Sequence, residues 1–200
     1  MRRISTLIAS LALVTFVSDA DALDNTRKGF MVGAGLGLAS SNYSLDAVVI
    51  ENMVPTTMEF ANDQSFAFGI DFRMGWGINE QVMVFGLSRI PWFDNPITSR
   101  GSSVTAGILA LAATYSFRAE PGGPYVLGGL GLSSWANGFP AQNPDTWWGF
   151  GVIAGFGWEV KPHFPFELTV QWGKPTGEEF GFNTSANTVS VIGTIGIWLY

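Results

Sequence analysis

The segment Ser65–Trp76 reads S-F-A-F-G-I-D-F-R-M-G-W, with a large apolar side chain at every second position from Phe66 onward. A period of two is typical of a β-strand, in which successive side chains point to opposite faces. The positions between the large residues are small or charged, and they include Asp71 and Arg73. A soluble sheet would turn its large residues inward against a core. Here we expect the aromatic face to meet lipid and the small face to line a narrow lumen.

The last segment, Asn187–Tyr200, reads N-T-V-S-V-I-G-T-I-G-I-W-L-Y and has the same strand character. An exposed apolar strand at the end of a chain is an edge that invites aggregation. A closed barrel in a membrane removes that edge, because the last strand pairs with the first. The segment therefore indicates a closed barrel.

The composition supports a membrane protein without spanning helices. The chain has 200 residues, 47% of them hydrophobic and 13% charged, whereas soluble domains carry roughly 25% charged residues. A spanning helix needs about 20 apolar residues, and the stretch at 104–117 is shorter and interrupted by glycine and hydroxyl side chains. The fold class predicted is all-β: an eight-stranded antiparallel transmembrane up-and-down β-barrel.

Eight alternating segments are expected to be the strands, and short turns alternate with longer loops between them. That alternation is typical of outer-membrane barrels, which have short periplasmic turns and longer extracellular loops. The expected strands are Gly29–Ala39, Ser65–Trp76, Gln81–Ile90, Val104–Phe117, Tyr125–Trp135, Trp147–Val160, Phe166–Gly173 and Asn187–Tyr200.

Two strand faces are harder to assign. In the third strand we expect Met83, Phe85 and Leu87 to face lipid, with a bulge near Gly86 turning Arg89 inward. In the last strand, apolar residues occupy both faces, and the register stays open. All eight tryptophans fall near expected strand ends, where aromatic girdles meet the membrane interface. They are Trp76, Trp92, Trp135, Trp147, Trp148, Trp158, Trp172 and Trp198.

The first 22 residues are expected to be a cleaved signal peptide. Arg2 and Arg3 precede an apolar stretch, and Ala20-Asp21-Ala22 is an A-x-A cleavage site. Residues 23–200 then form the barrel domain. An uncleaved anchor is the less favoured alternative, because the apolar stretch is short. Export followed by a barrel predicts localisation in a bacterial outer membrane.

Several chemistries are disfavoured by composition. The chain has no cysteine, and its net charge is −6. A basic face for nucleic acid is therefore not expected. Glycine runs such as Gly33-Ala34-Gly35 are not followed by a helix, so they fit a crowded lumen better than a dinucleotide motif. We expect no cofactor and no metal.

Charged and polar side chains on the inward faces form the main candidate site. Arg73 could pair bidentately with Glu167 or Glu159 across the narrow interior. One hypothesis is a structural plug of paired charges, and the alternative is a gate that re-pairs to admit ions or small solutes. The candidate residues are Asp71, Arg73, Arg89, Glu159, Glu167 and Gln171.

The single histidine, His163, lies in an expected periplasmic turn. Hydrolytic catalysis would need a serine and a carboxylate beside it, and the sequence around it offers no such constellation. We therefore predict that the protein is not an enzyme.

The first long loop, 40–64, is too apolar for a simple solvated loop. We expect it to extend the first two strands as a hairpin above the membrane, and the alternative is an exposed patch that contacts a partner or an apolar ligand. The candidate contact residues are Val48, Val49, Ile50, Met53, Val54 and Phe60.

Three short motifs resemble small outer-membrane barrels of the OmpA/OmpX/OmpW-like superfamily. They are the opening G-F-M-V-G-A-G-L-G at 29–37, the P-Y-V-L-G-G-L-G-L strand at 124–132, and the terminal Trp198-Leu199-Tyr200. The resemblance implies that Trp198 and Tyr200 belong to a C-terminal signal read by the barrel-insertion machinery, although Phe is the usual last residue. It also implies a monomer in contact with outer-membrane lipid and lipopolysaccharide.

The function expected from the residues and the resemblance is a non-enzymatic scaffold that interacts through its loops. The alternative is a narrow pore for ions or small, possibly apolar, solutes. A lipid-modifying enzyme is the third alternative. It is kept because resemblance to a superfamily does not fix function.

Overall fold

The computed structural model describes residues 26–51, 54–94, 103–137, 146–179 and 182–200. The expected signal peptide at 1–22 lies outside the described residues. Eight strands make up almost all of the described chain, and they are β1 (Gly29–Glu51), β2 (Val54–Gly77), β3 (Val82–Asp94), β4 (Ser103–Ser116), β5 (Gly123–Asn137), β6 (Thr146–Lys161), β7 (Phe164–Glu179) and β8 (Phe182–Leu199). None of the described residues forms a helix long and apolar enough to cross a membrane.

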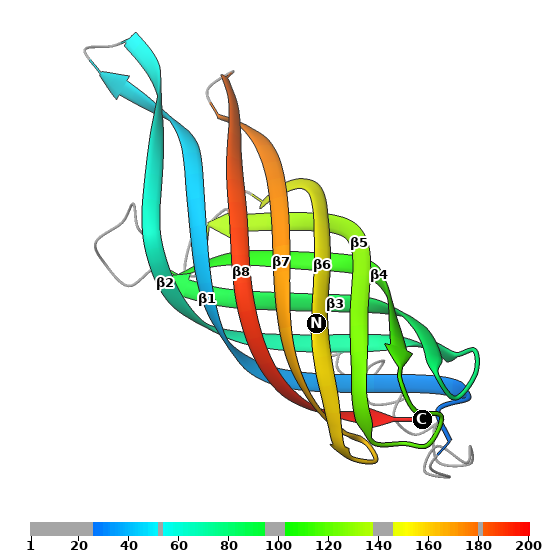
Figure 1. The fold of residues 1–200 in the computed structure, drawn as a ribbon. Coiled ribbons are helices and arrows are strands. Elements are labelled where there is room, and N and C mark those ends of the chain that lie inside the picture. Colours follow the sequence, from blue (N-terminus) through cyan, green and yellow to red (C-terminus); the bar gives the residue numbers. More distant parts are fainter. Residues whose placement is uncertain (1–25, 52–53, 95–102, 138–145, 180–181) are drawn as a thin grey trace, which may run out of the picture.

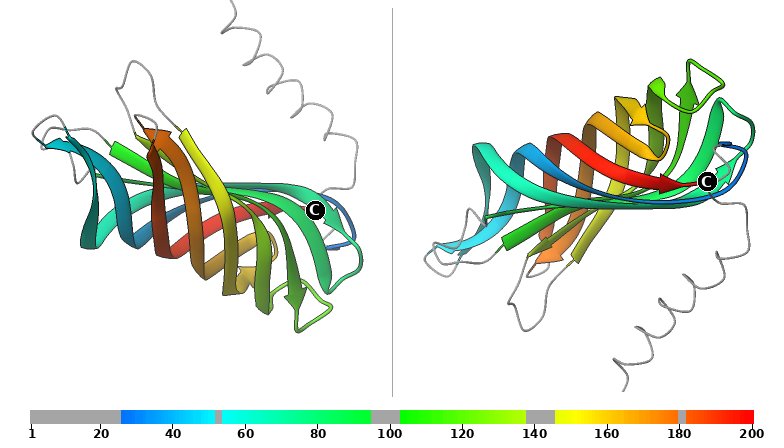
Figure 2. Two further views of the ribbon diagram at one scale, coloured as in Figure 1. Left: turned by 90° about the horizontal axis from the view of Figure 1, so that it is seen from above. Right: turned by 90° about the horizontal axis from the view of Figure 1, so that it is seen from below.

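The strands form a closed antiparallel barrel (Figure 1). Each strand pairs with the next along the chain, and β8 closes the ring by pairing with β1 from Val32↔Leu199 to Asp46↔Ser185. The strands run obliquely around the barrel (Figure 2). The predicted fold class and strand number are confirmed. The C-terminal end, Arg27 and the three short turns lie together at one end of the barrel, called the terminal end below.

Alternation along β2 separates an apolar exterior from a lumen, as the sequence predicts. Phe66, Phe72 and Trp76 expose 83%, 47% and 58% of their surface. Asp71 and Arg73, between them, are buried. Alternating positions along β1, β4, β5 and β6 likewise expose large apolar side chains on the exterior. The resulting apolar belt is the surface that a bilayer would cover.

The expectation for β3 is wrong. Met83, Phe85 and Leu87 point into the lumen and are fully buried, on the same face as Arg89. The β2–β3 ladder runs without a register shift from Gly77↔Met83 to Phe68↔Trp92, so no bulge rotates Arg89. Glycines on neighbouring strands make room for these large side chains.

Phe85 shows how that room arises. A Cβ added at Gly75 on β2 would lie 2.5 Å from the Phe85 Cβ, which is too close for two real side chains. The glycine-rich inward faces therefore mark where bulky lumen residues from the next strand are accommodated. Because Met83, Phe85 and Leu87 occupy this space, part of the lumen is apolar.

The structure fixes the register of β8, which the sequence left open. Val189, Val191, Ile195 and Ile197 face outward, whereas Ile192, Trp198 and Tyr200 face the lumen and are buried. The tryptophan expectation is correct only in part. Trp135, Trp147 and Trp198 are buried in the interior rather than placed in an exterior girdle.

The first two strands are much longer than expected. Their ladder continues beyond the barrel to Glu51↔Val54, with one irregularity between Ser41 and Tyr43. The segment expected as a loop at 40–64 is thus mostly a two-stranded extension, which confirms the hairpin interpretation. In Figure 1 this β1–β2 hairpin projects at the end opposite the C-terminus.

Candidate functional site

The candidate site is a buried ion cluster formed by two arginines and two carboxylates. The Arg73 guanidinium on β2 binds Glu167 on β7 through Nη1–Oε1 and Nη2–Oε2 contacts of 2.8 and 2.9 Å. Arg89 on β3 lies 2.7 Å from Glu167 Oε2 and 2.6 Å from Asp71 Oδ2. Arg73 Nη2 also reaches Asp71 at 3.0 Å. The expected pairing of Arg73 with Glu167 is therefore present, and it is bidentate.

The surrounding side chains complete this ion cluster. The Tyr125 hydroxyl donates to Glu167 Oε1 at 2.9 Å, and Arg89 Nη1 donates to the Thr169 hydroxyl at 2.5 Å. The Arg73 guanidinium lies 5.3 Å from the Phe85 ring centroid and 5.1 Å from that of Trp198. With two positive and two negative groups, the cluster is neutral. Neutrality and hydrogen bonding are the conditions under which buried charges are tolerated.

Glu159, the other partner proposed for Arg73, belongs to a second cluster nearer the terminal end. Its Oε2 accepts from Arg27 Nη2 at 2.5 Å and from the Gly122 backbone N–H at 2.9 Å. Its Oε1 accepts from the Tyr200 hydroxyl and from the His163 backbone N–H. One carboxylate on β6 thus binds residues from both ends of the described chain.

Arg27 is a site residue that the sequence reasoning missed. Its Nη1 donates to the backbone carbonyls of Glu80 and Arg118 at 3.0 Å each, so it links the β2–β3 and β4–β5 turns. The position of Arg27 in the sequence could have identified it as a lumen residue. Arg27 is in phase with Gly29 and Met31 on the inward face of β1, so continuing that alternation backward would have placed its side chain at the lumen.

His163 has a structural environment in the β6–β7 turn. Its backbone adopts φ = 73°, its Nδ1 lies 2.9 Å from the Trp198 carbonyl oxygen, and its ring packs 4.6 Å from that of Tyr200. Tyr200 follows the last strand, and burial together with its hydrogen bond to Glu159 raises the pKa of its phenol above the ordinary value. These contacts hold the C-terminal end in place.

Gln171 lies in the lumen apart from the ion cluster. Its Nε2 donates to the Ala106 carbonyl at 3.0 Å. Its buried Oε1 has no hydrogen-bond partner among the described residues. The structure therefore groups Asp71, Arg73, Arg89 and Glu167, and separates Glu159 and Gln171 from them.

An aromatic cluster fills the lumen on the side nearer the β1–β2 hairpin. The ring centroids of Tyr43, Phe93 and Trp135 lie 5.3 to 5.6 Å from one another. They belong to a larger buried apolar group that includes Trp147 and Ile192. This cluster was not expected from the sequence, because Trp135 and Trp147 fall near strand ends, where an exterior aromatic girdle was predicted.

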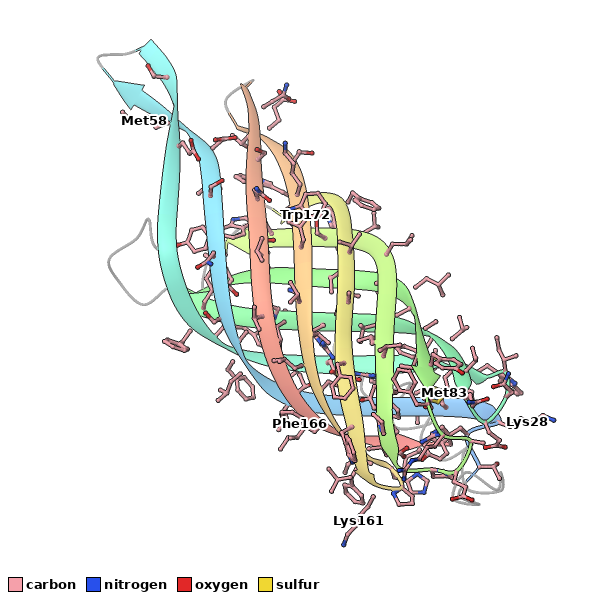
Figure 3. The ribbon with its side chains drawn as sticks, in the orientation of Figure 1. Lys28, Met58, Met83, Lys161, Phe166 and Trp172 are labelled. Carbon is pink, nitrogen blue, oxygen red and sulfur yellow. The ribbon has the colours of Figure 1, made fainter. Side chains whose placement is uncertain are left out.

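The candidate contact residues of the first loop lie on the β1–β2 hairpin, except for Met53. Val48, Val49 and Ile50 belong to β1, and Val54 and Phe60 to β2. Met53 lies outside the described residues. Figure 3 labels Met58 on this hairpin, and 42% of the Met58 surface is exposed.

The fold is similar to those of small outer-membrane barrels of known structure. Neisserial surface protein A has a TM-score of 0.50 and 14% identity, with 85% of this chain and 97% of that chain covered. This chain has the fold of a small outer-membrane β-barrel. The fold and the apolar belt agree with the outer-membrane location expected from the sequence.

Two further solved structures score slightly lower. OprG from Pseudomonas aeruginosa has a TM-score of 0.49 and 12% identity over 88% of this chain and 98% of its own. Ail, the attachment invasion locus protein of Yersinia pestis, has a TM-score of 0.47 and 11% identity over 85% and 99%. No family model matches the sequence, and a search of curated proteins gives no match.

Proposed function

We propose that this protein is a non-enzymatic, non-conducting scaffold of the bacterial outer membrane that presents the β1–β2 hairpin at the cell surface. The observation that carries the proposal is the filled interior. The ion cluster joins β2, β3 and β7 across the lumen, and Tyr125 adds a contact from β5. A solute would have to separate Arg73 from Glu167 to pass.

The regions on either side of the ion cluster support the same conclusion. The aromatic cluster of Tyr43, Phe93 and Trp135 lies toward the hairpin. Arg27 and Glu159 lie toward the chain ends, and both side chains are at most 1% exposed. Three successive layers of buried side chains thus oppose a continuous water path. An eight-stranded barrel is narrow enough for side chains to fill it.

The test of this proposal is a planar-bilayer recording of refolded residues 23–200, after a heat-modifiable shift in gel mobility has shown folding. We expect no reproducible current steps. Reproducible steps from the folded wild-type protein would instead support the narrow pore for ions or small solutes. A barrel with a disrupted ion cluster provides the positive comparison and is considered in the Discussion.

The hairpin is the part proposed to interact with lipopolysaccharide or a surface partner. Its ladder lets it be shortened cleanly, because Asp46 pairs with Glu59. Replacing residues 47–58 by Asn-Gly, a favoured two-residue hairpin turn, should leave the barrel folded. We expect weaker binding to immobilised lipopolysaccharide in surface plasmon resonance. Equal binding by the shortened and full-length proteins would remove the hairpin from the proposal.

The non-enzymatic part of the proposal is supported by the surroundings of the single histidine. The His163 ring contacts a backbone carbonyl and Tyr200, and the nearby Glu159 carboxylate already binds Arg27 and Tyr200. In a hydrolytic triad, a carboxylate free of other partners orients the histidine beside a nucleophile. Loss of a measurable lipase or protease activity in His163→Ala would contradict this assignment.

A further inference from the structure

An apolar groove lies on the exterior of the barrel where β6, β7, β8 and β1 follow one another. Its volume is about 540 Å³. The residues that shape it are Ala34, Leu36, Phe164, Phe166, Ile195 and Ile197. Phe166 and Ile195 face each other across the β7–β8 ladder, and Ile197 pairs with Ala34 across the barrel seam.

The hollow is explained by the small side chain of Ala34. Its neighbours across the two ladders are Ile197 and Phe72, and the next outward residue along β1 is Leu36, which is 54% exposed. Phe164 and Phe166 are about half exposed and form the far wall. A linear apolar chain would fit between these larger side chains.

The groove ends beside a cation. Val160 and Phe164 both line it, and Lys161 follows Val160 directly and pairs with Phe164 in the β6–β7 ladder. Lys161 is exposed and takes part in none of the ion pairs found among the described residues. In Figure 3 its side chain extends away from the strands at the terminal end, below the labelled Phe166.

We propose that this groove is a binding site for an anionic glycerophospholipid of the membrane leaflet at the terminal end, with an acyl chain over Ala34 and the phosphate at Lys161. The exterior around the groove is the apolar belt, so a bilayer lipid is the occupant that its surroundings supply. The ammonium group is the complement of the phosphate. This inference is independent of whether the lumen conducts.

The expected selectivity is modest and comes from the head group. Acyl chains gain only packing from an apolar groove inside a bilayer, because the lipid around them is equally apolar. One basic side chain near an anionic surface favours binding by about fivefold. The preference of phosphatidylglycerol over phosphatidylcholine should therefore be several-fold rather than absolute.

The test is native mass spectrometry of the folded barrel in detergent, titrated with palmitoyl-oleoyl phosphatidylglycerol or the matching phosphatidylcholine. Ala34→Phe fills the groove and should reduce retention of the first lipid of either kind. Lys161→Gln should remove the preference for phosphatidylglycerol and leave phosphatidylcholine retention unchanged. The matched controls are Ala113→Phe, on the outward face of β4, and Lys28→Gln, on the other side of the terminal end in Figure 3.

Retention like that of the wild type in both control variants, with the two losses above, supports the site. Equal losses in Ala34→Phe and Ala113→Phe would show lipid bound nonspecifically around the belt. An unchanged head-group preference in Lys161→Gln, or no preference in the wild type, would overturn the proposal. Heat-modifiable gel mobility establishes that each variant is folded before titration.

Discussion

At the scale of single residues, the main feature is that four charged side chains are buried together. Arg73, Arg89, Asp71 and Glu167 are each no more than 5% exposed. Desolvating such groups is costly, and only mutual pairing with good hydrogen bonds offsets the cost. The two parallel hydrogen bonds from the Arg73 guanidinium to the Glu167 carboxylate have the bidentate geometry in which arginine pairs are strongest.

Glu167→Gln should therefore be strongly destabilising. The substitution keeps the shape of the side chain but leaves two buried guanidinium groups with one carboxylate, Asp71. Breaking a buried pair in this way costs about 3–5 kcal/mol. Urea unfolding in detergent, followed by tryptophan fluorescence, measures the loss. The exposed Glu178→Gln is the control, and similar unfolding midpoints for the two variants would contradict the account.

Tyr200 gives the terminal end a dependence on alkaline pH. Burial and the Glu159 carboxylate raise the pKa of its phenol, so the folded state holds this proton more tightly than the unfolded chain does. The resulting stability is complete below the ordinary tyrosine pKa of about 10 and is lost as pH rises through the higher folded value.

Tyr200→Phe removes this titrating group and should flatten the fall in unfolding midpoint above about pH 10. The comparison is made against Tyr115→Phe, whose ring lies on the outward face of β4 with 46% of its surface exposed. Midpoints are read from urea curves at each pH. Parallel curves for the wild type and Tyr200→Phe would show that the buried phenol is not responsible.

At the scale of elements, glycines on one strand accommodate large lumen side chains on the next. Tyr125 on β5 pairs with Gly157 on β6. A Cβ at Gly157 would lie 2.1 Å from Tyr125 Cζ, whereas a Cβ at Gly128 would meet nothing within 4 Å. The two glycines lie on adjacent strands, so Gly128 can serve as the control position for a substitution at Gly157.

Gly157→Ala should destabilise the barrel by about 1–3 kcal/mol, the usual cost of overpacking. It should also disturb the Tyr125 hydrogen bond to Glu167. Gly128→Ala should leave stability almost unchanged. The free energies of unfolding from urea titration decide between these expectations, and equal values for the two variants would mean that the lumen is less tightly packed than the structure indicates.

The β3 strand shows where reasoning from sequence reached its limit. Alternation correctly placed Arg89 on the same face as Met83, Phe85 and Leu87. The assumption that large apolar residues face lipid then required a bulge that does not exist. Choosing the face needed the position of Gly75 on the neighbouring strand, which is a tertiary fact and not a property of β3 itself.

At the scale of the whole molecule, the barrel architecture was predictable because it follows from local alternation repeated along the chain. The eight strands, their order and most outward faces follow from a period of two. The extension of β1 and β2 was expected as a hairpin because residues 40–64 are too apolar for a solvated loop, and its ladder runs on from the barrel strands. The pairing of Glu159 with Arg27 depends on where distant strands meet, and sequence spacing carries no such information.

The central claim is that paired buried charges close the lumen. Current recordings in a planar bilayer test it most directly when Arg73→Glu is compared with the reversed pair Arg73→Glu/Glu167→Arg. We expect no current from the wild type and increased current from the single variant, because like charges then face each other. The reversed pair restores opposite charges, so its current should be lower than that of the single variant. Folded single-variant protein that stays as silent as the wild type would contradict the claim.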